Sequence, residues 1–357
     1  MMKGLKKWRL FSLLAVLTVF LSACTGEDYI STLKPAGEVG EDQYDLLIFS
    51  ISIMTLVVVV VSFLYLYAFT KFRRSKLGDK HMPKQVEGSH TLEVIWSVIP
   101  IILLLILAVP TILSTYKFAD VKAMDEVDEE GNKTALTVNV TAKLYWWEFE
   151  YPEQGIVTAQ ELVVPTNEKV YFNLKAADVK HSFWIPAVGG KMDNNVENVN
   201  KFWLEFGKES EGLKDGVFYG KCAELCGPSH ALMDFKVKTV DRAEFDQWVA
   251  AMQATEGQTA SVDSTDLGEA TFAQSCLGCH AVSGVGTTGA MGPNLTTFGD
   301  RNRVAGVLEH SKESLENWIS DPEAIKPGNL MTGKYSELSP EEISAVADYI
   351  MSLSVEK

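Results

Sequence analysis

The chain has 357 residues, a net charge of −15 and a hydrophobic content of 46%. This length allows two or three domains, and the negative charge argues against a nucleic-acid partner, whose phosphates would be repelled. The charge fits an acidic face that attracts a basic protein. The five cysteines are an odd, locally paired set, which is not typical of a disulfide framework.

Residues 1–23 have the features of an export signal. Four basic residues precede the apolar run from Leu10 to Leu21, which is too short to cross a membrane comfortably. The tetrapeptide Leu-Ser-Ala-Cys24 resembles a lipoprotein signal-peptidase site. This resemblance implies cleavage before Cys24 and a lipid on its thiol, with residues 24–45 as an external N-terminal segment. The alternative is an uncleaved anchor helix with an idle cysteine.

Residues 46–117 are predicted to form a transmembrane helical hairpin. Leu46 to Phe69 contains no charge, and Val94 to Leu113 is a second apolar run, interrupted only by prolines that membrane helices tolerate. The loop between the two runs is rich in lysine and arginine, which places it in the cytoplasm. The N-terminal segment and everything after Lys117 then lie outside the cell, in agreement with a lipidated Cys24.

Residues 118–254 are predicted to form an all-β domain. Apolar and polar residues alternate in 136–141, 170–174 and 202–206, and residues 145–151 form an aromatic run. Several short strands with turn signals between them indicate a sandwich or barrel of antiparallel strands. Asp241 to Ala254 is predicted to be the helix that closes the domain.

One loop of this domain, Cys222-Ala-Glu-Leu-Cys226-Gly-Pro-Ser-His230-Ala-Leu-Met233, carries two thiols, an imidazole and a thioether. Soft sulfur with imidazole suits copper or zinc, and the thioether favours copper because zinc rarely takes methionine. His181 is the best candidate for a second imidazole. A Cys-x-x-x-Cys pair alone is weak evidence, since a zinc half-site or a disulfide has the same spacing.

The complete loop closely resembles the binuclear copper A loop of cytochrome c oxidase subunit II. The resemblance implies a cupredoxin fold and two copper ions bridged by the two thiolates. The implied ligands are His181, Cys222, the backbone carbonyl of Glu224, Cys226, His230 and Met233. It also implies that the carboxylate of Glu224 helps to hold a magnesium or manganese ion at the interface with subunit I.

Residues 255–265 are polar and are expected to form a flexible linker. Residues 266–357 are predicted to form an all-α domain, whose last helix has a serine cap, a first-turn proline and a capping-box glutamate at Ser339, Pro340 and Glu342. Helices are also predicted from Leu267 and from Lys312.

The sequence Cys276-Leu-Gly-Cys279-His280 is the signature of covalent c-type haem, in which both thiols bind the haem and His280 binds its iron. With Gly292-Pro293 downstream, this region resembles a class I cytochrome c. That family has a Gly-Pro turn that accepts a hydrogen bond from the proximal imidazole, and a distal methionine. Met331 is the expected distal ligand and Met291 is its competitor.

The resemblance covers nearly the whole mature chain, from the hairpin through the copper domain to the fused cytochrome c domain. It implies an electron-transfer subunit of an oxidase in a bacterial cell membrane, with both cofactor domains on the external face. Electrons would pass from a cytochrome c or an upstream reductase complex to haem c, to copper, and to subunit I. That subunit reduces oxygen to water with proton translocation, and subunit III is a further implied partner.

The resemblance assigns roles to four more residues. Glu93 matches a carboxylate near the start of a proton path in subunit I, although a solvated helix-end carboxylate explains it equally well. In the family, the first tryptophan of an aromatic run accepts electrons from a separate cytochrome c. Here Tyr145 occupies that position, so Trp146 is a substitute, or the electrons come from the attached domain. Core packing is expected for at least one ring of the set Tyr145, Trp146 and Trp147.

Three other functions are compatible with parts of the sequence. A quinol oxidase subunit II would share the architecture but lacks the copper ligands that this chain keeps. A membrane-anchored copper carrier would use a mononuclear, exchangeable site and has no need of a haem domain. A structural zinc lipoprotein would leave Met233, Met331 and the haem signature without a purpose.

Overall fold

The computed structural model describes residues 16, 26–78, 81–82, 85–286 and 291–356. The predicted export signal and Cys24 therefore lie outside the described residues, apart from Val16. Contacts divide the chain into two compact units, residues 42–119 and the remainder. Each unit is described separately below.

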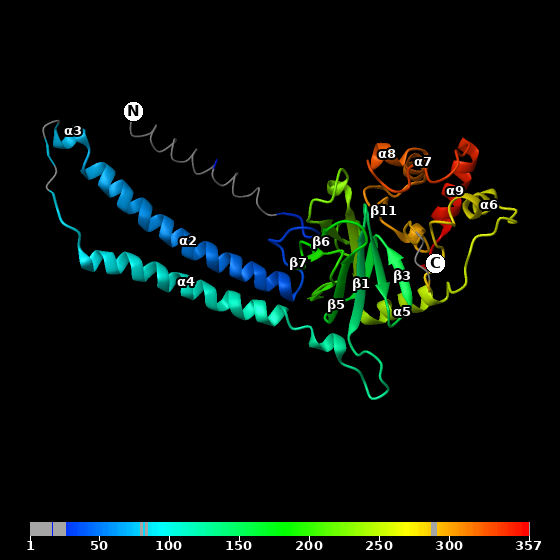
Figure 1. Ribbon diagram of the computed structural model, residues 1–357, viewed down its shortest axis with the longest axis horizontal. Coiled ribbons are helices and arrows are strands. Elements are labelled where there is room, and N and C mark those ends of the chain that lie inside the picture. Colours follow the sequence, from blue (N-terminus) through cyan, green and yellow to red (C-terminus); the bar gives the residue numbers. More distant parts are fainter. Residues whose placement is uncertain (1–15, 17–25, 79–80, 83–84, 287–290, 357) are drawn as a thin grey trace, which may run out of the picture. The chain divides into compact units, whose positions relative to one another are not determined.

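The first unit contains two long helices, α2 (Glu38–Lys71) and α4 (His90–Phe118), with the short α3 (Arg74–Leu77) between them (Figure 1). Within the described chain these two helices are long and apolar enough to cross a membrane. Both extend beyond the predicted apolar runs, because polar residues at their ends continue the helical hydrogen bonding. At one end of the hairpin, Asp42 accepts a 2.6 Å hydrogen bond from Ser114 and pairs with Lys117 at 3.3 Å.

Two prolines, Pro100 and Pro110, lie inside α4 without ending it. The hydroxyls of Thr111 and Thr115 donate to the carbonyls of Leu107 and Thr111, each at 2.8 Å. Such bonds satisfy the threonine hydroxyls within the helix itself. At the start of α4 the Ser89 hydroxyl accepts from the Leu92 amide, which is an ordinary helix cap.

The second unit begins with a β-sandwich of two five-stranded sheets. The first sheet has the order β3-β2-β1-β5-β8, with strands Ile156–Ala159, Trp146–Tyr151, Leu136–Lys143, Lys169–Ala176 and Asn200–Glu205. The second has the order β4-β10-β9-β6-β7, with strands Glu161–Pro165, Asp234–Val240, Phe218–Cys222, His181–Ile185 and Gly189–Asn194. The predicted all-β, cupredoxin-like domain is confirmed in this fold class.

The prediction of purely antiparallel strands was wrong at two pairs, because β1 runs parallel to β5 and β10 parallel to β4. The chain leaves the first sheet after β3 and enters the second as β4. Gln160 makes this corner with a positive φ of 67°. Its side-chain oxygen accepts a 3.0 Å bond from the Trp147 amide, which fixes the turn. A change of sheet between adjacent strands cannot be read from alternation alone.

Aromatic rings fill the interior of the sandwich. Phe183 and Phe235 stack with centroids 4.7 Å apart, and Trp147 packs on both. Helix α5 (Arg242–Gln253) closes the sandwich by burying Phe245, Trp248 and Met252. Trp147 and Phe183 lie on strands whose ends meet at residues 222–233, the copper-type loop. The core therefore supports that loop directly.

The C-terminal part of the second unit is helical, with α6 (Leu267–Ser275), α7 (Lys312–Ser320), α8 (Pro322–Ile325) and α9 (Pro340–Ser352) (Figure 1). A short hairpin joins β11 (Arg303–Val304) to β12 (Leu308–Glu309). Helices α6 and α9 pack closely because Gly268 faces a carbonyl, where a Cβ would lie 2.2 Å from the Ala345 oxygen. The predicted capping box of Ser339 and Glu342 is confirmed.

Candidate metal and haem sites

The loop between β9 and β10 brings the predicted copper ligands together. Strand β9 ends at Cys222, and β6 begins at His181 and pairs antiparallel with β9, placing Phe183 opposite Cys222. Because side chains alternate along a strand, the side chain two residues before Phe183 lies on the same face. The sheet therefore brings His181 to the loop from a distant part of the sequence.

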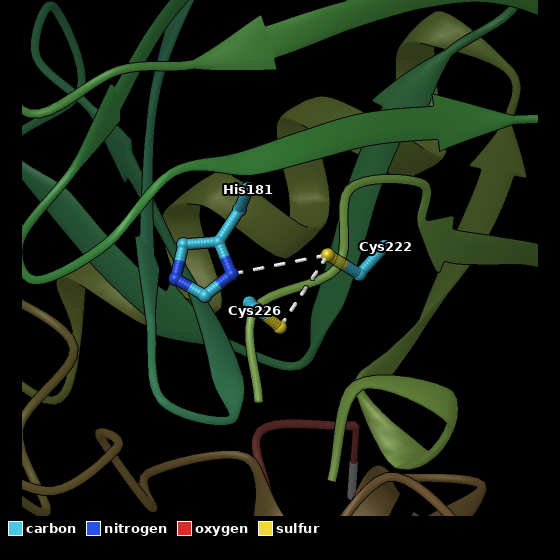
Figure 2. Close-up of side chains that lie close together, drawn as sticks. All are labelled: His181, Cys222 and Cys226. Atoms are coloured by element: carbon cyan, nitrogen blue, oxygen red, sulfur yellow. Dashed lines mark hydrogen bonds between the residues drawn. The ribbon is translucent and has the colours of Figure 1, made fainter. Parts of the chain in front are cut away.

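The two thiols lie at the centre of this group. The Cys222 and Cys226 sulfurs are 4.0 Å apart, and the Cys222 sulfur is 3.8 Å from His181 Nδ1 (Figure 2). The Cys226 sulfur is 3.6 Å from His230 Nδ1 and 3.8 Å from Met233 Sδ. The backbone carbonyl of Glu224 lies 3.3 Å from the Cys222 sulfur. Donor atoms of all the predicted ligand residues thus lie beside a cysteine sulfur.

Each thiol has its own imidazole neighbour and its own weaker donor. Cys222 has His181 and the Glu224 carbonyl, whereas Cys226 has His230 and the Met233 thioether. Two sulfurs, two nitrogens, a thioether and a carbonyl form a soft donor set suited to copper. The residues present therefore fit a copper centre.

Burial and charge make the two thiols unequal. Burial opposes ionisation of Cys222, but contacts with His181 and with the backbone of Glu224 and Ser182 together outweigh burial and lower the pKa of that thiol to about 7. Burial and the neighbouring Cys222 raise the pKa of Cys226 above its usual range. Two thiolates 4.0 Å apart repel each other. Both therefore ionise together only when a cation lies beside them, as a bound metal would.

Asp178 is a site residue that the sequence analysis did not assign. Its carboxylate lies 2.8 Å from Nε2 of His181, and it accepts bonds of 2.7 Å from the amides of Leu144 and Val179. These bonds leave Nδ1 of His181 facing the Cys222 sulfur. A carboxylate behind a ligating histidine fixes the ring and its tautomer. Its position three residues before a predicted ligand histidine was the available signal.

The three aromatic candidates have different surroundings. Trp147 is fully buried in the sandwich core and its indole donates to the Met233 carbonyl at 3.3 Å. Trp146 is 8% exposed and Lys143 lies over its ring at 4.6 Å. The Tyr145 hydroxyl lies against Gly227 of the loop, where a Cβ would lie 2.4 Å from the hydroxyl oxygen, and burial together with Cys226 raises the pKa of that hydroxyl. Tyr145 is therefore a neutral ring in contact with the copper-type loop.

The haem signature follows α6 in a tight backbone turn. The amides of Cys279 and His280 both donate to the Cys276 carbonyl at 3.0 Å. His280 Nδ1 lies 2.8 Å from the Pro293 carbonyl, the contact implied by the resemblance to class I cytochromes. Gly292 permits this approach, since a Cβ there would lie 2.5 Å from the imidazole. Because Nδ1 donates, Nε2 is left as the nitrogen with a free lone pair.

A cavity adjoins this turn. Its walls include the haem signature, both candidate methionines and several apolar side chains, namely Cys276, Cys279, His280, Met291, Met331, Phe272, Leu295 and Ile350. Arg301 also lines it, and the Nε of this buried guanidinium has no hydrogen-bond partner among the described residues. A carboxylate of a bound haem would satisfy such a donor, so the cavity fits the cofactor.

Both methionines line the cavity, and hydrogen bonds hold the loop of Met331. The Met331 amide donates to the Asn329 side chain at 2.8 Å, and the Gly328 amide donates to Glu323 at 2.9 Å. Met291 is 47% exposed. The choice of Met331 as distal ligand stays a prediction that these contacts favour.

The copper-type domain supplies part of the same cavity wall. Tyr145 and Trp146 line it from β2 and the turn before it. Tyr145 thus lies between the cavity and the copper-type loop. Glu93 lies in the other unit, in the first turn of α4.

Comparison with known proteins agrees with the division of the chain into an apolar hairpin, a β-sandwich and a helical C-terminal region. Family models describing the transmembrane domain of cytochrome c oxidase subunit II match residues 36–113, and those describing its periplasmic domain match residues 153–240. A cytochrome c model matches residues 265–354. Hairpin, β-sandwich and helical region each correspond to one of these matches.

Close relatives match along the whole chain. Cytochrome c oxidase subunit 2 of Bacillus sp. strain PS3 is 57% identical over 359 aligned positions, covering 100% of both chains. The subunit 2 of Bacillus subtilis strain 168 is 52% identical and covers 98% of this chain and 99% of its own. The periplasmic domain of subunit II of Bradyrhizobium japonicum cytochrome oxidase is 33% identical, covering 32% of this chain and 91% of that structure, with a TM-score of 0.30.

Full-length identity at this level, together with the three domain matches, establishes the family. The apolar hairpin and its transmembrane-domain match make the protein membrane-anchored, and a subunit II is part of a haem–copper oxidase complex. The chain is a member of the cytochrome c oxidase subunit II family, with a cytochrome c domain fused to its C-terminus.

Proposed function

We propose that this subunit relays electrons from a covalent haem c through a binuclear copper A centre to subunit I of the oxidase. The observation that carries the proposal is the placement of both thiols between two imidazoles, a thioether and a carbonyl. The copper ligands would be His181, Cys222, the Glu224 carbonyl, Cys226, His230 and Met233.

The bound groups would supply reversible one-electron chemistry at nearly fixed geometry. The protein's part is to hold the ligands rigidly. Asp178 orients His181, the sandwich core supports the loop through Trp147, and the Gly292-Pro293 turn orients His280. Rigid ligands limit the reorganisation that accompanies a change of charge, which suits a relay. A His280/Met331 pair would raise the haem potential into a range useful for reducing copper.

Tyr145 is the proposed contact between the two sites. Its ring lines the haem cavity, and its hydroxyl lies against Gly227 of the copper loop. All three aromatic candidates are buried, which favours electron delivery from the attached haem domain over delivery to copper by a separate cytochrome c. The external donor, a cytochrome c or a reductase complex, would then reduce the haem domain.

The remaining assignments follow from the family and from membrane topology. The cofactor domains would lie on the external face of a bacterial cell membrane, with a lipid on Cys24 as a second anchor. Subunits I and III would contact the chain in the complex, and Glu93 would lie near a proton path in subunit I. The magnesium or manganese ion at the Glu224 carboxylate also stays a prediction, since the metal-ligand group found among the described residues is His181, Cys222 and Cys226.

The proposal is tested on the purified full-length chain matured with haem and copper. We expect two coppers per haem and an electron paramagnetic resonance signal from one unpaired electron shared by both coppers. Cys222→Ser should abolish this signal while the haem absorbance remains. A single copper with a mononuclear spectrum would favour a copper carrier, and bound zinc would favour a structural site; either result would overturn the relay.

A further inference from the structure

The haem-domain loop 326–331 lies against the copper loop 222–233. Gly328 lies at this contact, where a Cβ would lie 3.2 Å from the Pro228 ring and 3.5 Å from the Tyr145 hydroxyl oxygen. Gly328 also has a positive φ of 76°, a conformation that favours glycine. A side chain at this position would press the two loops apart.

One hydrogen bond joins the two loops, and a second joins the haem-domain loop to Tyr145, in the turn before β2. The Ser229 hydroxyl donates to the Pro327 carbonyl at 2.8 Å, and the Lys326 side-chain nitrogen donates to the Tyr145 carbonyl at 2.9 Å. Ser229 is 0% exposed and Lys326 is 3% exposed. A buried lysine is rare and costly unless it is hydrogen-bonded. Among the described residues, the one hydrogen bond of the Lys326 side chain goes to the copper domain.

Tyr145 contacts both loops. Its carbonyl accepts a hydrogen bond from Lys326 of the haem-domain loop, and its hydroxyl lies against Gly227 of the copper loop, where a Cβ would lie 2.4 Å from the hydroxyl oxygen. The backbone of Tyr145 is therefore held by one loop while its ring tip contacts the other.

The rest of the domain contact does not depend on these bonds. The Val157 amide donates to the Gly284 carbonyl at 2.8 Å, and the Asn302 amide donates to the half-buried Glu161. Arg303 pairs with Asp215 elsewhere in the interface. Removing a loop-to-loop bond therefore leaves the two domains packed, and changes the loops locally.

We propose that Ser229 and Lys326 are positioning residues. Ser229 fastens the haem-domain loop 326–331 to the copper loop 222–233, Lys326 fastens the same loop to the backbone of Tyr145, and together they fix Tyr145 between the two sites. The purpose of this fastening rests on the proposed function. The fastening itself is a property of the chain, and it can be measured without electron transfer.

The test is amide hydrogen exchange in the full-length, haem-containing chain, followed by mass spectrometry. Lys326→Met keeps the length of the side chain and removes its donors, whereas Ser229→Ala removes the hydroxyl. Each variant should speed exchange in both loops about tenfold, because a hydrogen bond to a charged or buried group shifts an opening equilibrium by about that factor. Lys312→Met, a matched charge loss on α7, should leave both loops unchanged.

The haem midpoint potential is measured on the same samples, because Lys326 also lines the haem cavity. Unchanged exchange in both variants would overturn the proposal. A shifted potential with unchanged exchange would assign Lys326 to the cofactor instead, and would also overturn it. Separately, flash-induced haem-to-copper transfer in the copper-loaded parent chain tests the proposed function. Its absence there would overturn the relay but leave the fastening intact.

Discussion

Asp178 contributes no donor atom to the copper-type site, but it orients the predicted ligand His181. Its carboxylate holds Nε2 of His181 and also accepts two backbone amides. The imidazole is therefore fixed with Nδ1 toward the sulfurs. Burial works to lower the pKa of His181, but the bonds to Asp178 and Cys222 outweigh it and raise that pKa.

Asp178→Asn should weaken copper binding by about 10- to 100-fold, because the loss of a carboxylate behind a ligating histidine has that typical cost. Copper affinity is measured by competition with a chelator. Asp246→Asn, an exposed carboxylate on α5, is the matched control and should bind copper normally. Equal affinities for the two variants would show that Asp178 does not orient the ligand.

Met331→Ala should leave haem covalently attached and change its visible spectrum, because the attachment uses Cys276 and Cys279 while the distal ligand is lost. Met291→Ala is the paired variant, since both methionines line the cavity. Its spectrum should match that of the parent chain. The reverse pattern would make Met291 the ligand.

At this scale the motifs predicted the candidate residues well. All six copper-type positions lie together, and the Pro293 carbonyl meets His280. Their supports were not predicted, because Asp178, Ser229 and Lys326 belong to no motif. Their importance comes from burial and from partners distant in the sequence, which spacing does not reveal.

The helices and strands show where local patterns are sufficient and where they are not. The last helix begins at Pro340 with the predicted cap, because capping involves residues within one turn. The parallel pairs β1–β5 and β4–β10 were missed, since strand order depends on long-range pairing. The polar stretch 255–265 was expected to be flexible. In the structure Ala260 packs into the haem-domain core and the Thr255 hydroxyl accepts from the Gly284 amide.

Ser339→Ala should destabilise the haem domain by about 1 kcal/mol, the usual cost of removing a helix N-cap hydroxyl. Both capping-box bonds would be affected, because the Ser339 hydroxyl accepts from the Glu342 amide while the Glu342 carboxylate accepts from the Ser339 amide. Denaturant unfolding followed by haem absorbance measures the change. Ser336→Ala, at an exposed position just before the helix, should cost much less.

At the scale of the whole molecule, the contact between copper and haem domains contains a buried lysine whose charge depends on pH. Burial lowers the pKa of Lys326 to about 7 from 10.5, with Asp234 raising it and Lys236 lowering it further. Between pH 7 and pH 10.5 the Lys326 side chain binds more protons in the unfolded chain than in the folded chain. The free energy of unfolding is therefore not reduced by this lysine above pH 10.5, and it falls as the pH is lowered to about 7.

The parent chain should accordingly gain stability relative to Lys326→Met as the pH rises from 7 to 9. The gain is at most about 1.4 kcal/mol per pH unit, the limit for one proton. Denaturant unfolding of both proteins across this range provides the difference, in which other titrating groups cancel. A difference that is constant with pH would show that Lys326 keeps its ordinary pKa when folded.

The domain contact could not be predicted from the sequence, although the domains could. Arg303, Asn302 and Glu161 carry no motif, yet they join the two domains at the surface around β11. Such contacts depend on which surfaces meet, and that is decided by folding and not by local composition.

One polypeptide carries both proposed redox domains, joined through residues 254–266 between α5 and α6. A covalent link turns a bimolecular encounter into an intramolecular one with a high effective concentration of one site near the other. The step between haem and copper should therefore be independent of dilution and insensitive to ionic strength. The reaction with the external donor keeps a diffusive encounter and so carries the salt dependence of the whole chain of transfers.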